Sequence, residues 1–137
     1  MSSKLSAEWG PFASRLSEAL AVLGEDEYLV LSEQQGQYFV QFAAQGPYGL
    51  RVEAVSDRFL DASAQYDEAQ RSRLRELHWA EPTEDPDHPD GSPNYWREFE
   101  LPVAFDEAAT LTVDTLVSVH GVRHPGQLRY RAFDQDG

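Results

Sequence analysis

The spacing of hydrophobic positions predicts a helix at the start of the chain. The first apolar residues recur at steps of three and four, which is the helical period. They are Leu5, Trp9, Phe12, Leu16, Leu20 and Leu23. A proline is tolerated in the first turn of a helix but not deep inside it. We therefore expect the regular helix to begin near Pro11, after a lead-in turn with Leu5 and Trp9, and to stop at Gly24.

Three β-prone segments joined by short turns come next. Residues 27–32, 37–43 and 48–55 are rich in β-branched and aromatic side chains. In the last segment Arg51 and Glu53 alternate with apolar neighbours, the pattern of a strand with one buried face. In the middle segment Tyr38 shares the apolar face. The three segments predict an antiparallel meander.

The second half of the chain predicts another helix, a loop, a strand and a final helix. Asp67 and Gln70 have the spacing of a capping box at the start of a helix over 67–78. Residues 81–93 hold four prolines and five carboxylates, so we expect an exposed acidic loop. A strand is expected over 94–101 and a helix over 105–120. Residues 127–133 could add a short strand.

The resulting order is α-β-β-β-α-β-α with a possible final β. A run of strands flanked by helices predicts the α+β class, with helices packed on an antiparallel sheet. The length of 137 residues predicts a single domain over 1–137.

Composition then narrows the function. The chain has 11 Lys and Arg against 24 Asp and Glu, a formal charge of −13. Such a chain is repelled by phosphates and anionic lipid heads, so we expect no nucleic-acid or membrane partner. It has no cysteine, which excludes thiolate chemistry. No signal peptide and no apolar stretch of membrane-spanning length is visible, so we expect a cytoplasmic protein.

The segments in this order resemble a known family. The resemblance is carried by residues 36–43, 50–56, 74–79 followed by Pro82, 93–96 and 119–121. The pattern is similar to the type III secretion chaperone-like fold, and more closely to its YbjN-like branch, which includes small actinobacterial TY-Chap proteins. The family pattern has glycine before the tryptophan, where this chain has His78. The resemblance implies a non-enzymatic protein that holds a partner polypeptide, commonly as a homodimer, and it carries over no catalytic residue.

The sequence contains no pattern that points to catalysis or to a cofactor. It lacks a nucleophile elbow, a phosphate-binding glycine loop and a dinucleotide fingerprint. His120 and His124 are four residues apart, but Gly121 ends the helix between them, so we interpret His120 as a helix-end histidine near the C-terminal dipole. The acidic loop fails the calcium pattern, because the fifth position counted from Asp85 is Pro89. We expect no metal.

Aromatic and charged side chains on the strands are the better candidates for a binding surface. Trp79, Tyr95 and Trp96 bracket the acidic loop, and Trp and Tyr are favoured anchors of interfaces. Either they pack in the core or they face a partner. Strand parity predicts that Trp96 points away from the helices. The candidate partner-binding residues are Tyr38, Arg51, Glu53, Trp79, Tyr95, Trp96 and Glu98.

Three hypotheses about function follow. The first is a chaperone-like module that holds a protein client against the open sheet face and its edge, as a homodimer. The acidic surface would favour a basic client. The second is an acidic inhibitor or immunity-type protein that neutralises a basic partner and shows one coherent acidic face. The third is an enzyme or small-ligand protein with a deep polar pocket. The arginines of residues 71–75 are expected to pair with neighbouring carboxylates, or else to contact an anionic partner.

Overall fold

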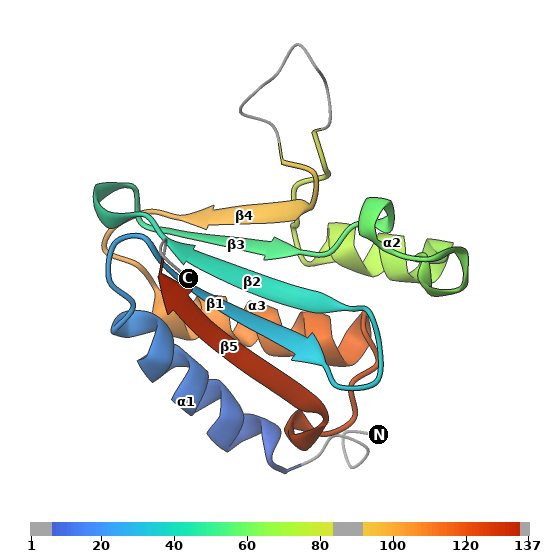
Figure 1. The fold of residues 1–137 in the computed structure, drawn as a ribbon, viewed down its shortest axis with the longest axis horizontal. Coiled ribbons are helices and arrows are strands. Elements are labelled where there is room, and N and C mark those ends of the chain that lie inside the picture. The colour runs from blue at the N-terminus through green and yellow to red at the C-terminus, as the bar shows by residue number, and fades with distance from the viewer. Residues whose placement is uncertain (1–6, 84–91, 135–137) are drawn as a thin grey trace.

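The chain forms one open antiparallel sheet with two helices on one of its faces (Figure 1). The computed structural model describes residues 7–83 and 92–134. In chain order the helices and strands are α1 (Trp9–Ala21), β1 (Glu27–Glu33), β2 (Phe39–Ala44), β3 (Leu50–Ala54), α2 (Glu68–Glu76), β4 (Tyr95–Phe99), α3 (Phe105–Ser118) and β5 (Leu128–Asp134). This confirms the predicted α+β class and the predicted order, final strand included.

The sheet has the strand order β4-β3-β2-β1-β5. The first three strands form the predicted meander, with Leu29 opposite Phe42 and Phe42 opposite Val52. The last strand, β5, returns from the end of α3 and pairs antiparallel with β1, so the first and last strands of the chain are neighbours. Helices α1 and α3 pack on each other and on the same sheet face, while α2 lies beyond one end of the strands (Figure 1).

The core lies between the sheet and this helical layer. One parity of every central strand is buried there, as alternation predicts. The largest fully buried side chains are Phe42, Leu20, Leu50, Leu74, Leu116, Val40, Val52, Val55, Thr112 and Thr115. The opposite parity forms a sheet face that no helix of the described ranges covers.

Helix α1 begins two residues earlier than expected. Pro11 is its third residue and still lies in the first turn, where the missing N–H costs no hydrogen bond. Trp9 is therefore the first residue of the helix and is only 5% exposed. Leu5 lies outside the described residues. The helix ends at Ala21, so the prediction that Gly24 stops it was three residues late.

Helix α3 ends at Ser118, two residues before the predicted end. Its buried face also includes Thr112 and Thr115, which the apolar pattern did not mark. Each hydroxyl donates to the carbonyl four residues earlier, at 2.8 Å in both cases. A threonine can be buried in this way because its polar atom is satisfied within the helix.

No helix of the described residues is long and apolar enough to cross a membrane.

Both ends of α2 are fixed by local hydrogen bonds. Asp67 accepts from the Gln70 amide at 2.8 Å and the Gln70 side chain accepts from the Asp67 amide at 2.9 Å, which confirms the capping box. At the other end the amides of His78 and Trp79 bond back to Arg75 and Leu74. This is the closing pattern of a helix whose reversing residue adopts the left-handed conformation. Here that residue is His78, with φ 67°.

The left-handed position predicts that His78→Gly stabilises the fold. The left-handed conformation costs about 1–2 kcal/mol of free energy for a residue with a Cβ and nothing for glycine. Glycine is, however, the more flexible residue in the unfolded chain, which offsets part of this difference. We expect a net gain of about 0.5–1 kcal/mol in the free energy of unfolding, measured by urea titration. His78→Val is the control and should lower this free energy. A glycine variant no more stable than the wild type would contradict the assignment.

Candidate functional site

Four of the predicted partner-binding residues meet on the uncovered face of the sheet. The register of β3 and β4 places Arg51 opposite Glu98 and Glu53 opposite Trp96. Arg51 donates to Glu98 at 2.6 Å and to Glu53 at 3.0 Å, and its guanidinium carbon lies 4.9 Å from the centre of the Trp96 ring. Trp96 does point away from the helices. One cation thus joins two carboxylates and an aromatic ring.

The position of Glu53 is fixed from three sides. Besides Arg51, it accepts hydrogen bonds from the side-chain amides of Gln41 at 3.2 Å and Asn94 at 3.1 Å. Asn94 is itself buried and accepts from the Ser56 amide. A carboxylate held by several donors has one orientation, so this part of the face is preorganised.

The rest of this surface is apolar and aromatic. We call it the open face, and it consists of the outward, mostly half-buried side chains Tyr28, Val30, Phe39, Gln41, Ala43, Arg51, Glu53, Trp96, Glu98 and Phe133. Tyr28 and Phe133 stack on it with ring centres 5.3 Å apart. The face therefore carries aromatic side chains on both edge regions, with a polar cluster beside Trp96.

The other three candidates lie on the helical side of the sheet. Trp79 is 4% exposed, and its indole N–H donates to the Thr115 hydroxyl at 3.0 Å. Tyr95 is 8% exposed. Tyr38 donates its hydroxyl proton to the Ala64 carbonyl at 2.8 Å. Each aromatic group is thus held by the fold itself.

A groove that the sequence analysis missed runs between α1 and β5. We call it the β5 groove; its volume is about 560 Å³. It is lined by Glu8, Phe12, Arg15, Leu16, Ala19, Leu29, Leu31, His124, Pro125, Gly126, Leu128 and Tyr130. Tyr130 points toward the helical side, yet it is 78% exposed and lines the groove together with residues of α1. The only sequence signal was the apolar parity of Leu128 and Tyr130.

The two edges of the sheet differ. On the β4 edge, the backbone of Ala80 exchanges two hydrogen bonds with Trp96, at 2.9 and 3.1 Å. At the other edge β5 pairs with β1 on one side only and is the last strand of the sheet. Within the described residues, no other segment therefore pairs with the outer edge of β5.

A scan against protein-family models matched residues 2–134 to TY-Chap3, described as "T3SS (YopN, CesT) and YbjN peptide-binding chaperone 3". The chain belongs to the TY-Chap3 family. The match spans nearly the whole chain and confirms the resemblance seen in the sequence. The family gives this protein a peptide-binding, chaperone-like role. Comparisons with curated proteins and with solved structures found no match.

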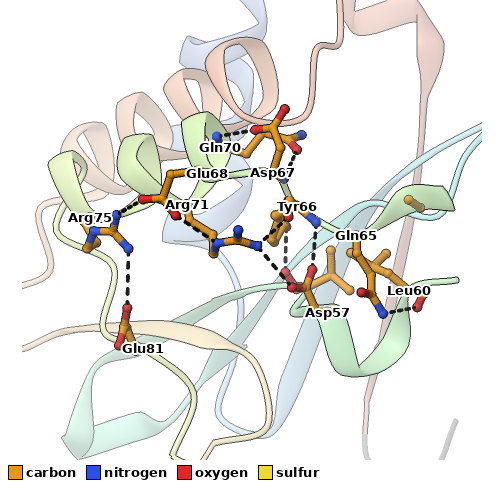
Figure 2. A network of polar contacts seen from close by, with 12 residues as sticks. Asp57, Leu60, Gln65, Tyr66, Asp67, Glu68, Gln70, Arg71, Arg75 and Glu81 are labelled. Atoms are coloured by element: carbon orange, nitrogen blue, oxygen red, sulfur yellow. Dashed lines mark hydrogen bonds and ion pairs between the residues drawn. The ribbon is translucent and has the colours of Figure 1, made fainter. Parts of the chain in front are cut away.

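The arginines of α2 in this TY-Chap3 protein are paired with carboxylates, as expected. Figure 2 shows the pairs of Arg71 and Arg75. Arg75 contacts Glu68 at 2.7 Å and Glu81 at 3.9 Å, and Arg71 contacts Glu68 at 3.5 Å. Arg71 also donates to the Tyr66 carbonyl. Most of the acidic loop, residues 84–91, lies outside the described residues. At its base the Thr83 amide donates to the Ser92 carbonyl at 2.8 Å.

His120 lies just after the end of α3, as predicted, and it is a buried, neutral residue. It is 5% exposed and stacks on Tyr38 with ring centres 4.7 Å apart. Tyr66 uses its one hydroxyl proton on the Val55 carbonyl, at 2.6 Å, and so accepts from His120 Nε2 at 3.0 Å. Nδ1 of His120 then keeps a lone pair, with no partner among the described residues.

Burial therefore lowers the pKa of His120 to about 3, because a second proton would be placed in the core without an acceptor. The same burial raises the pKa of the Tyr66 hydroxyl. His124 lies apart from this cluster, where its Nδ1 accepts from the Gly126 amide. The described ranges contain no group of three residues suited to hold a metal ion.

The buried His120 predicts a loss of stability in mild acid. The unfolded chain binds a proton at this histidine below its ordinary pKa of 6.5, whereas the folded chain does so only near 3. The contribution of the neutral His120 to the free energy of unfolding is complete above pH 6.5. It falls as the pH drops from 6.5 toward 3. We expect a loss of about 1.4 kcal/mol between about pH 7.5 and 5.5, measured by urea unfolding.

His120→Leu is the control for this experiment, because leucine fills a similar volume and does not titrate. The variant should lose less stability than the wild type over the same pH range. Equal pH dependence in both proteins would show that His120 is not the responsible group.

Proposed function

We propose that this TY-Chap3 protein is a non-enzymatic chaperone that holds an extended client segment on the free edge of β5, over the β5 groove. The observation that carries this proposal is the position of the groove directly beside an unshared strand edge. An edge strand offers a row of main-chain donors and acceptors, and the adjoining groove offers apolar contact. Together these are the two parts of peptide recognition by strand addition.

The geometry suits an extended segment. Side chains alternate between the two faces of a strand, so every second residue of an added strand lies on the side of the groove. The groove walls are apolar except for Glu8, Arg15 and His124. Such a lining accepts aliphatic and aromatic side chains. It favours a peptide over a substrate that needs many convergent polar groups, as in an enzyme.

We further propose that two copies associate through the open face. This face presents half-buried aromatic side chains from several strands, and contiguous exposed apolar surface is typical of interaction sites. Trp96, Arg51, Glu53 and Glu98 are the proposed contacts, because a preorganised aromatic and arginine cluster is typical of binding anchors. Tyr38, Trp79 and Tyr95 are left out of the proposed surface because they are held on the helical side.

The net charge of the chain affects how readily a client approaches the protein more than it affects the contacts of the bound client. A net charge of −13 favours encounter with a basic client in the cytoplasm, and we propose such a client. The alternative of an acidic inhibitor requires one coherent acidic face. The open face instead mixes Arg51 with Glu53 and Glu98. No observation favours the inhibitor.

Filling the β5 groove should weaken peptide binding without unfolding the protein. Ala19 lines the groove and is exposed, so Ala19→Trp adds bulk there and removes no core side chain. Peptides are first selected from a random display library with the wild type. Their affinity for the variant, measured by fluorescence anisotropy, should be weaker by about tenfold or more, equivalent to about 1.4 kcal/mol.

Ser14→Trp is the matched control, because Ser14 is exposed on the same helix and does not line the groove. This variant should bind the selected peptides like the wild type. Failure to select any peptide, or equal binding by the two tryptophan variants, would overturn the proposed site.

The open face predicts a dimer that depends on Trp96. Light scattering coupled to gel filtration should give twice the 15.5 kDa mass of the chain. Trp96→Thr keeps a β-branched residue in the strand but removes the aromatic anchor, so it should shift the mass toward the monomer. Phe59→Thr, which removes an exposed aromatic ring outside the sheet, should leave the dimer intact. A monomeric wild type would refute this part of the proposal.

A further inference from the structure

Two arginines on β5 differ from Arg51 on β3 and from the arginines of α2. Arg129 and Arg131 are exposed, and their register against Ser32 and Val30 places them on the side of the open face. Arg131 lies 4.9 Å from the centre of the Phe133 ring, and Arg129 reaches the Gln34 carbonyl at 3.5 Å. Within residues 7–83 and 92–134, neither guanidinium has a carboxylate within salt-bridge distance.

This is unexpected in a chain with a charge of −13. Arg51 on β3 and all three arginines of α2 contact a carboxylate. The cations without such a contact include the two that stand side by side on the free edge strand. They are two residues apart, so both point the same way, about 7 Å apart along the strand.

The side chains of β5 that alternate with these arginines face the groove. Leu128 and Tyr130 lie between and beside the arginines in sequence and line the β5 groove on the helical side. A strand added to β5 would repeat this division, because directly opposed residues in neighbouring strands share a face. One parity of the added strand would enter the groove, and the other would lie beside Arg129 and Arg131.

A second copy of β5 is disfavoured at this edge in the register that would pair the two strands about Tyr130. In an antiparallel pair centred on Tyr130, Arg129 of one copy would lie opposite Arg131 of the other, and like charges directly opposite are destabilising. Charged residues on edge strands commonly prevent such self-pairing. A strand that carries carboxylates at these positions would form two favourable pairs.

We propose that the client segment bound at β5 alternates apolar and acidic residues, with the apolar ones in the groove and the carboxylates on Arg129 and Arg131. This inference rests on the proposed function and names the chemistry of its ligand. The net charge of the chain does not oppose it at contact, because the screening length at physiological salt is only about 8 Å. A client that is basic elsewhere can still carry such a segment.

The test uses labelled peptides of seven residues, the length of β5, in the full chain at physiological salt. One peptide alternates Glu with Leu, the second alternates Lys with Leu, and the third alternates Glu with Ser. We expect the Glu-Leu peptide to bind best. The double variant Arg129→Ser/Arg131→Ser should weaken its binding by about five- to tenfold, as expected for the loss of two cross-strand pairs. Arg129→Glu/Arg131→Glu should instead prefer the Lys-Leu peptide.

Arg73→Ser/Arg75→Ser is the matched control. It removes the same two charges from α2, which lies across the fold from β5 (Figure 1), and should leave peptide binding unchanged. Equal affinity for the Glu-Leu and Lys-Leu peptides, or wild-type affinity in the β5 double variant, would overturn the inference. If library peptides bind and Ala19→Trp blocks them in that case, the proposed function stands and only the acidic specificity fails. If Ala19→Trp blocks nothing, the β5 site itself fails.

Discussion

The burial of the sheet on one face only is the constraint on which the rest of the structure depends. Two helices pack on the side of Phe42, Leu50 and Val52, and they leave the other parity of every strand half exposed. The outward polar groups of such a sheet can bond to one another as well as to water. The cluster of Arg51, Glu53 and Glu98 does so beside Trp96, and it gives the open face a fixed shape.

The groove lies at one end of this arrangement. Helix α3 lies behind the central strands, whereas α1 lies alongside β5, the last strand of the sheet (Figure 1). The helical side of β5 is incompletely filled, because α1 and β5 leave the groove between them and Tyr130 stays exposed. A free backbone edge and an apolar groove thus occur together at β5.

Much of the fold could be read from the sequence, since local signals and tertiary packing agree. The capping box of α2, the meander and the outward position of Trp96 were all predicted correctly, because each depends on residues close in sequence or on strand parity. What the sequence did not show concerns burial and contact. His120 lies at the end of α3 as predicted, but spacing alone could not show that it is a core residue stacked on Tyr38, 82 positions away. The burial of Thr112 and Thr115 was missed because a search for apolar residues passes over threonine. Each of these hydroxyls donates to a carbonyl of its own helix and can therefore be buried.

The sequence by itself determined the order of elements, the face on which each strand residue lies, the acidic character and the membership of the TY-Chap3 family. The first three properties follow from periodicity and composition along the chain, and the family follows from the match of residues 2–134 to the family model. Only the tertiary structure decided that β5 pairs with β1, that a groove lies between β5 and α1, and that Arg51 contacts carboxylates while Arg129 and Arg131 contact none among the described residues. Those facts are contacts between residues far apart in sequence. Periodicity gives the direction in which a side chain points, but only the packed chain shows what stands opposite it.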